Sequence, residues 1–213
     1  MKFVRFLIIF VMLAFLGIAL LVATIKDKAE LAKPRGDLET MKASDFYNGR
    51  FVEGEIYDIW DNYAYLEESD TIFGISYNTK TTAQYYAMPL PSSYDEEELK
   101  FVALSIRDAA TQKTANRVVE ETADYLDGKE LPEWTTLNVT GKVTKLSGEG
   151  LGLFRSYISK MGGGEENIVA YVINVGNDGG GSTGVMILAI VLTVIGLGGS
   201  VFLIIRRVLA GSY

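Results

Sequence analysis

The sequence predicts a membrane α-helical hairpin that carries one small α+β domain between its two helices. Three observations lead to this fold class. Two long apolar runs lie near the ends of the chain, the region between them alternates as β-strands do and includes one or two helical stretches, and a glycine-rich segment precedes the second run. We expect a membrane helix at 3–25, a juxtamembrane linker at 26–43, the domain at 44–176, a tether at 177–184, a second membrane helix at 185–205 and a tail at 206–213.

The two apolar runs are long enough to cross a lipid bilayer. Residues 6–23 and 185–205 contain no charged side chain, and a helix of about 20 apolar residues spans the ~30 Å of bilayer hydrocarbon. Lys2 and Arg5 before the first run also fit the start of a cleaved signal peptide. The apolar core is longer than that of a usual signal peptide and a good cleavage site is missing, so we favour an uncleaved span.

Charges beside the runs predict the orientation. Arg206 and Arg207 directly follow the second run, and no Lys or Arg lies at 168–183 before it. Basic residues are enriched on the cytoplasmic side, so we expect both termini in the cytoplasm and the domain outside. Basic residues after the first run oppose this orientation: Lys26, Lys28, Lys33 and Arg35. We give the second run more weight because its asymmetry is complete and long loops are translocated largely regardless of charge.

The second run carries small residues at helical spacing. Such residues let two membrane helices approach closely, so they form a predicted helix-packing face, with contact expected inside the hairpin. The residues on the second run are Ala189, Thr193, Gly196 and Ser200, and the proposed matching residues on the first are Gly17, Ala19 and Ala23.

The composition excludes several kinds of chemistry. The chain has no cysteine and no histidine, which excludes disulfides, thiolate nucleophiles, imidazole bases and Cys or His metal ligands. Between the apolar runs, 16 basic residues face 27 acidic ones, an imbalance that disfavours binding to a phosphate backbone. We therefore expect no nucleic acid, no metal and no cofactor.

The central region divides into short strands and two helices. A strand at 100–106 has apolar residues on both sides, which predicts a central position in the sheet. The first helix is expected from a cap at Asp108 or Thr111 to Gly128, and the second at 151–161. The segment 78–81 is predicted to be the turn of a hairpin. The remaining strands are expected at 51–60, 63–66, 72–77, 84–90, 136–146 and 168–175.

Two of these strands share the pattern V-x-G-x-[IV], in VEGEI and VTGKV. A glycine at the centre of a strand indicates a bulge or a sharp bend, and such bends recur in small barrels. We therefore expect a strongly bent, OB-like partial barrel. An ordinary α+β sheet with helices on one face is the alternative.

Residues 44–175 also carry a family resemblance. The order of RFVEGEIYDIWDNYAYLEE, YYAMPLP, KFVALSIRD, TADYLDG, VTGKVTKL, LFRSYIS and VAYVINV resembles a group of uncharacterised bacterial two-span membrane proteins. The resemblance implies one small β-rich domain between two membrane helices. It implies no activity, because the shared motifs are structural in type.

Aromatic residues provide the strongest candidate binding site. Tyr and Trp on a strand face can stack on sugars, peptides or protein surfaces, although they also fill small cores. The predicted aromatic ligand-binding face consists of Tyr57, Trp60, Tyr63, Tyr65, Tyr77, Tyr85 and Tyr86.

Acidic residues provide weaker candidates. Pairs among Glu53, Glu55, Asp58 and Asp61 have the residue type of a carboxylate hydrolase, but polar positions on the outer face of a strand explain them more simply. The acidic run 95–98 lacks an EF-hand pattern and is expected to be a solvated loop. No motif of an activated serine nucleophile is present, so we expect no catalysis.

These observations predict a non-catalytic, membrane-anchored binding or accessory module of the cell envelope. Its expected partners are membrane lipid and either another envelope protein or a second copy. The alternative is a structural subunit of a membrane complex, assembled through the two membrane helices.

Overall fold

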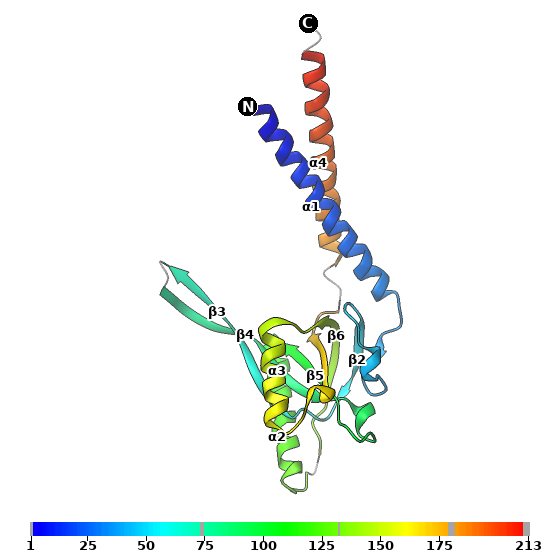
Figure 1. Cartoon of the computed structure of the whole chain (residues 1–213), viewed down its shortest axis with the longest axis vertical. Helices are drawn as coiled ribbons and strands as arrows, with labels where there is room; N and C mark the ends of the chain where they lie inside the picture. Colours follow the sequence, from blue (N-terminus) through cyan, green and yellow to red (C-terminus); the bar gives the residue numbers. More distant parts are fainter. Residues whose placement is uncertain (1, 73–74, 132, 179–181, 211–213) are drawn as a thin grey trace. The chain divides into compact units, whose positions relative to one another are not determined.

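The computed structural model describes residues 2–72, 75–131, 133–178 and 182–210. The chain forms two compact units (Figure 1). One contains the long helices α1 (Lys2–Leu31) and α4 (Ser182–Ala210), and the other is the domain Pro34–Asp178. The domain begins at Pro34 and not at the predicted residue 44, and its other boundary falls in the glycine-rich segment.

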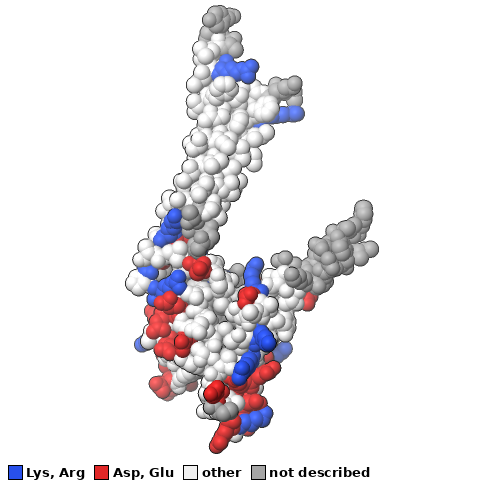
Figure 2. Space-filling view, turned by 180° about the vertical axis from the view of Figure 1, so that it is seen from behind, with Lys and Arg blue, Asp and Glu red and all other residues white. Residues whose placement is uncertain are grey.

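Helices α1 and α4 are long and apolar enough to cross a membrane. Their sequences contain no proline, and Pro34 lies just beyond the end of α1, where it prevents further helix. Most of their large apolar side chains are exposed to the surroundings. Figure 2 shows the helices as white over most of their length, with acidic side chains gathered on the domain.

The two long helices pack against each other through small residues. A Cβ added to Gly17 would lie 2.6 Å from the Thr193 backbone nitrogen, and one added to Gly196 would lie 2.6 Å from Ala14 Cα. Ala14 of α1 lies beside Gly196 of α4, and Gly17 lies beside Thr193, so the two helices run antiparallel. Only glycine permits this backbone approach, as in other close membrane-helix pairs.

The domain is built on a seven-stranded mixed sheet with the order β1-β2-β6-β7-β5-β4-β3. The β1–β2 and β5–β7 pairs are parallel, and the other neighbours are antiparallel. The strands are β1 (Gly36–Asp37), β2 (Phe51–Ile56), β3 (Asp61–Ile72), β4 (Ile75–Pro89), β5 (Phe101–Ile106), β6 (Leu137–Lys145) and β7 (Ile168–Val175).

One helix covers each face of this sheet. Helix α2 (Ala109–Leu126) packs on the face that includes Leu104, whereas α3 (Gly148–Lys160) packs on the face that includes Ala103. Strand β5 is buried along its whole length, as its two-sided apolar sequence predicts. Asp108 caps α2 by accepting a hydrogen bond from the Thr111 backbone N–H at 2.8 Å. The predicted combination of helices and sheet is confirmed, but the helices lie on both faces.

The sheet is open, and this differs from the expected OB-like closure. Strands β1 and β3 form its two edges in the described part of the chain. The two glycine-centred motifs pair with each other, Val52 opposite Gly141 and Gly54 opposite Val139, in a register without a bulge. A Cβ on Gly54 would lie 2.9 Å from Leu38 Cβ. The glycines therefore make room for neighbouring groups, rather than bending the strand into a barrel.

The predicted hairpin turn at 78–81 is also wrong. Strand β4 runs from Ile75 to Pro89, and Lys80 and Thr81 pair with Glu68 and Glu67 of β3. The polar residues of this stretch resemble a turn, yet threonine favours extended backbone and the partner strand provides the hydrogen bonds. Figure 1 shows that β3 and β4 extend well beyond the other strands.

Candidate binding groove

The domain has an open groove of about 1020 Å³. Its lining comes from the end of β2 and the residues that follow, the end of β4, the segment after β4, the end of α2 and Trp134. Buried apolar residues of the sheet, including Ile56 and Met88, line part of it. Apolar walls with a few polar groups are typical of ligand sites.

Asp58 is the most buried charged group in the groove lining. The next two residues fix its position. The Ile59 backbone N–H donates to Thr122 Oγ1 at 3.3 Å, and the Trp60 backbone N–H donates to the Ala87 carbonyl at 2.9 Å. Ile59 itself is fully buried in the core. These contacts hold the Asp58 carboxyl at the groove although it follows the end of a strand.

No Lys or Arg in the described lining of the groove offsets the negative charge of Asp58. Oδ2 accepts a hydrogen bond from the Tyr94 hydroxyl at 3.0 Å, while Oδ1 is buried without a hydrogen-bond partner among the described residues. Burial raises the pKa of the Asp58 carboxyl, and the nearby Tyr94, Trp60 and Thr122 side chains oppose this effect as hydrogen-bond donors. A partly buried carboxylate with a raised pKa and an unsatisfied oxygen is typical of a functional site.

Aromatic side chains form much of the exposed lining. Tyr94 is 51% exposed, Tyr125 is 60% exposed and Leu126 is 63% exposed. Tyr125 and Trp134 meet edge to face, with ring centroids 5.2 Å apart. Large apolar side chains that remain exposed beside one another mark surfaces that bind other molecules. The five aromatic residues of the lining are Tyr57, Trp60, Tyr94, Tyr125 and Trp134.

The charged residues of the groove are all of one sign. No Lys or Arg occurs among the described residues that line it, whereas five carboxylates do. The five are Glu39, Glu55, Asp58, Glu96 and Glu97. The groove is therefore both apolar and acidic.

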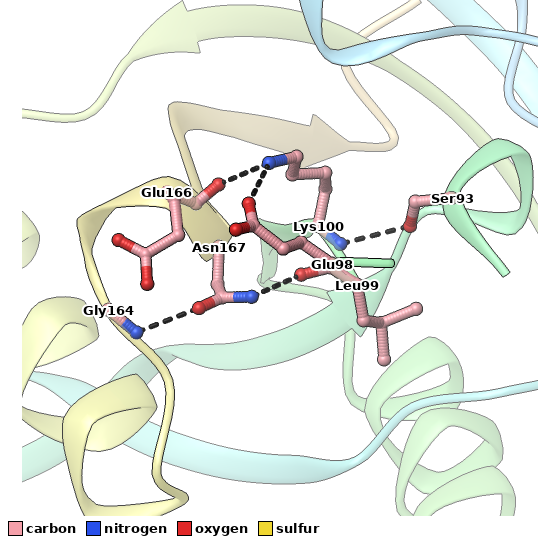
Figure 3. Close-up of polar contacts among 7 residues, drawn as sticks. All are labelled: Ser93, Glu98, Leu99, Lys100, Gly164, Glu166 and Asn167. Carbon is pink, nitrogen blue, oxygen red and sulfur yellow. Dashed lines mark hydrogen bonds and ion pairs between the residues drawn. The ribbon is translucent and has the colours of Figure 1, made fainter. Parts of the chain in front are cut away.

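The segment that carries Tyr94, Glu96 and Glu97 is fastened at its far end by a polar network (Figure 3). Asn167 Nδ2 donates to the Leu99 carbonyl at 2.8 Å, and Asn167 Oδ1 accepts from the Gly164 N–H at 2.7 Å. Figure 3 also shows Lys100, whose backbone N–H donates to Ser93 Oγ at 2.9 Å and whose Nζ donates to the Glu166 carbonyl at 2.7 Å. The network therefore fixes the far end of this segment and joins it to Ser93 at the near end.

The structure does not bring the seven predicted aromatic residues into one face. Alternation along β4 sends neighbouring side chains to opposite faces of the sheet. Tyr86 is therefore fully buried on the α2 side, whereas Tyr85 packs with Tyr63 beneath α3. Tyr57 and Trp60 line the groove, Tyr65 is exposed on β3, and the Tyr77 side chain lies outside the described residues.

The predicted helix-packing residues lie along the side of α4 that contacts α1. Ala189 and Gly196 are buried, and Thr193 and Ser200 are partly buried. Of the residues proposed on α1, Gly17 is buried in this contact, whereas Ala19 and Ala23 are exposed. Ala14, three residues before Gly17, is buried in the contact in their place and lies against Gly196. Arg206 is exposed near the end of α4, and Arg207 lies over the Phe3 ring, 4.5 Å from its centroid.

Of the four acidic residues singled out as pairs in the sequence, Glu55 and Asp58 line the groove, whereas Glu53 and Asp61 lie outside its lining. Glu53 pairs with Arg35 at 3.2 Å, and Glu55 accepts a hydrogen bond from the Tyr57 hydroxyl at 2.7 Å. Asp61 begins β3 and is exposed. In the acidic run 95–98, Glu98 pairs with Lys100 at 3.2 Å. Across the described residues, no group of three or more carboxylates is arranged to hold a metal ion.

Three aromatic residues of the groove are not predicted from the sequence: Tyr94, Tyr125 and Trp134. Tyr125 lies three residues after the buried Thr122, a spacing that favours burial, yet Tyr125 and Leu126 are exposed at the end of α2. Tyr94 and Trp134 lie outside the regular elements, where periodicity carries no information.

These features define a class of protein: an α+β domain with an acidic, aromatic groove, joined at both ends to helices long enough to cross a membrane. The chain belongs to the family described as domain of unknown function DUF8577, whose model matches residues 1–206. The match includes both long helices as well as the domain. A comparison with curated proteins finds no match to the chain.

Proposed function

We propose that the protein is a non-catalytic, membrane-anchored binding or accessory module of a bacterial cell envelope, and that the groove is its binding site. The observation that carries the proposal is the groove itself, whose lining combines exposed Tyr125, Leu126 and Trp134 with the partly buried Asp58 carboxylate. Leaving these groups exposed costs solubility, and a bound partner would cover them.

In this proposal, α1 and α4 cross the membrane and hold the domain outside the cytoplasm. Arg206 and Arg207 at the end of α4 support this orientation, because basic residues favour the cytoplasmic side. An acidic domain is also compatible with a position beside an anionic membrane surface without adhering to it.

The alternative function, a structural subunit assembled through its membrane helices, receives less support. The small-residue face of Ala189, Thr193, Gly196 and Ser200 is already used by α1 of the same chain. A partner helix would need a different side of the hairpin. We therefore place the partner, another envelope protein or a second copy, at the groove.

Site-specific photocrosslinking tests the proposal. A benzoylphenylalanine at position 125 in the groove is compared with one at position 153, because Leu153 is 44% exposed on α3 and lies outside the groove. We expect one discrete adduct from position 125 in native membranes, lost in the Trp134→Ala variant, and none from position 153. Equal adducts from both positions, or no adduct from position 125, would contradict the proposal.

A further inference from the structure

Resting on the proposed function, we infer that the groove binds a basic polypeptide segment in which arginine or lysine side chains are interspersed with apolar ones. The inference follows from the charge of the lining, the aromatic surface, the partly buried Asp58 carboxylate and the size of the groove.

Charge complementarity selects a cation. Each charged side chain in the described lining is a carboxylate: Glu39, Glu55, Asp58, Glu96 and Glu97. An anionic occupant, such as a nucleic acid or an anionic lipid surface, would be repelled by all five. A basic occupant would be attracted, because opposite charges across an interface steer association and exclude wrong partners.

The exposed aromatic rings fit a guanidinium or ammonium group with an apolar stem. Tyr57, Tyr94, Tyr125 and Trp134 each leave about two fifths or more of their surface exposed. Such rings attract cations over their faces, and they also pack against methylene groups. Arginine is enriched at protein interfaces for both reasons.

Asp58 is the most buried of the five carboxylates. Its Oδ2 accepts a hydrogen bond from the Tyr94 hydroxyl, and its Oδ1 is buried from solvent. No Lys or Arg in the described lining neutralises this charge, so a guanidinium seated on the groove would be attracted to it.

The extent of the groove favours a polypeptide over a small cation or a metal ion. A volume of about 1020 Å³ lies at the upper end of the range that small ligands fill, roughly 300–1,000 Å³. The carboxylates come from three separate stretches of chain, and no three of those described are grouped to hold one metal ion. An occupant with several cationic groups along its length matches this spread.

The chain offers a direct probe of binding. It contains two tryptophans, Trp60 and Trp134, and both line the groove. Full-length protein in phosphatidylcholine nanodiscs is titrated with a short acetylated and amidated peptide of alternating leucine and arginine, which contributes no tryptophan emission. Parallel titrations use a leucine–glutamate peptide, a serine–arginine peptide and arginine amide, each corrected with empty nanodiscs.

We expect a saturable change in tryptophan emission with the leucine–arginine peptide only, with a dissociation constant on the order of micromolar. Asp58→Asn keeps an acceptor for Tyr94 but removes the charge, and it should weaken binding about tenfold or more. Glu149→Gln, which removes one negative charge from α3 outside the groove, should leave the affinity within about twofold.

Other outcomes overturn the inference in distinguishable ways. Equal binding of the leucine–glutamate peptide would show a groove without charge selection. Arginine amide binding as tightly as the peptide would show a small-cation site. A response to no probe, with the position-125 adduct retained, would overturn the basic-peptide inference and leave the proposed function standing. Loss of both the response and the adduct would overturn both.

Discussion

At the scale of single residues, Asp58 is notable because its partial burial disfavours the charged carboxylate in the folded protein. Burial raises the pKa of this carboxyl above its ordinary value of 3.8, so folding favours the protonated form. The free energy of unfolding is then greatest below the unfolded-state pKa and falls as the pH rises through the folded-state pKa. A residue that weakens the fold at neutral pH is better explained by binding than by stability.

The Asp58→Asn variant tests this reasoning. Asparagine resembles the protonated acid, so we expect the variant to be more stable than the wild type at neutral pH. The difference in unfolding free energy between variant and wild type should vanish below a pH of about 3.8, where the wild-type carboxyl is protonated in both the folded and the unfolded state. Urea unfolding followed by tryptophan emission at several pH values provides the measurement. A variant less stable than the wild type at neutral pH would contradict the assignment.

Two glycines provide a matched pair of substitutions. A Cβ on Gly141 would lie 2.7 Å from the Asn174 carbonyl oxygen and 2.9 Å from Ile173 Cγ2, whereas one on Gly152 in α3 would meet nothing within 4 Å. Gly141→Ala should cost about 1–3 kcal/mol of unfolding free energy through overpacking. Gly152→Ala should add about 0.5–1 kcal/mol, because alanine is the better helix former. Equal changes in unfolding free energy from both substitutions would show that the close approach of β6 and β7 does not require glycine at position 141.

At the scale of elements, the α1–α4 contact depends on glycine on one side of α4 only. A side chain on Gly196 would meet the α1 backbone at Ala14, whereas one on Gly198 would meet nothing within 4 Å. We therefore expect Gly196→Ile to separate the helices and Gly198→Ile to leave them packed.

Disulfide crosslinking measures this separation. A Cβ on Gly199 would lie 2.7 Å from Phe10 Cγ, so Phe10→Cys and Gly199→Cys should crosslink on oxidation. The crosslink is scored by mass spectrometry after proteolysis, in a background that has no native cysteine. It should form with Gly198→Ile and be lost with Gly196→Ile. Retention of the crosslink in both backgrounds would show that the helices do not need this glycine.

The segment after β4 is held at its C-terminal end by the side chain of Asn167. Asn167 joins the Leu99 carbonyl to the Gly164 N–H. Asn167→Ala should accelerate amide hydrogen exchange across residues 91–100, because the segment loses its anchor, at a stability cost of about 1 kcal/mol. Asn138→Ala on the exposed side of β6 serves as the control. Unchanged exchange in Asn167→Ala would show that other contacts hold this wall of the groove.

At the scale of the whole molecule, the sequence predicts the elements better than it predicts how they join. Period and capping locate α2, with Asp108 at its start, and two-sided apolarity identifies β5 as central. The partners of a strand are not encoded locally, so the pairing of Gly54 with Val139 could not be predicted, and the glycines were interpreted as bends.

The candidate site shows the same limit. Tyr57 and Trp60 belong to the predicted aromatic face and line the groove, but their aromatic neighbours there come from distant segments, at Tyr94, Tyr125 and Trp134. Tyr85 and Tyr86 are adjacent in sequence yet lie on opposite faces of the sheet. A surface built from several segments depends on tertiary packing, which composition and periodicity do not specify.

A measurement of membrane topology tests whether two spanning helices hold the groove-bearing domain outside the cytoplasm, as we propose. Because the chain has no cysteine, Glu133→Cys beside the groove and Gly211→Cys in the tail can be labelled without background. Intact cells are treated with a membrane-impermeant maleimide. We expect labelling at position 133, and none at 211 until the membrane is opened. Labelling at 211 with protection at 133 would place the domain in the cytosol and contradict the proposed topology.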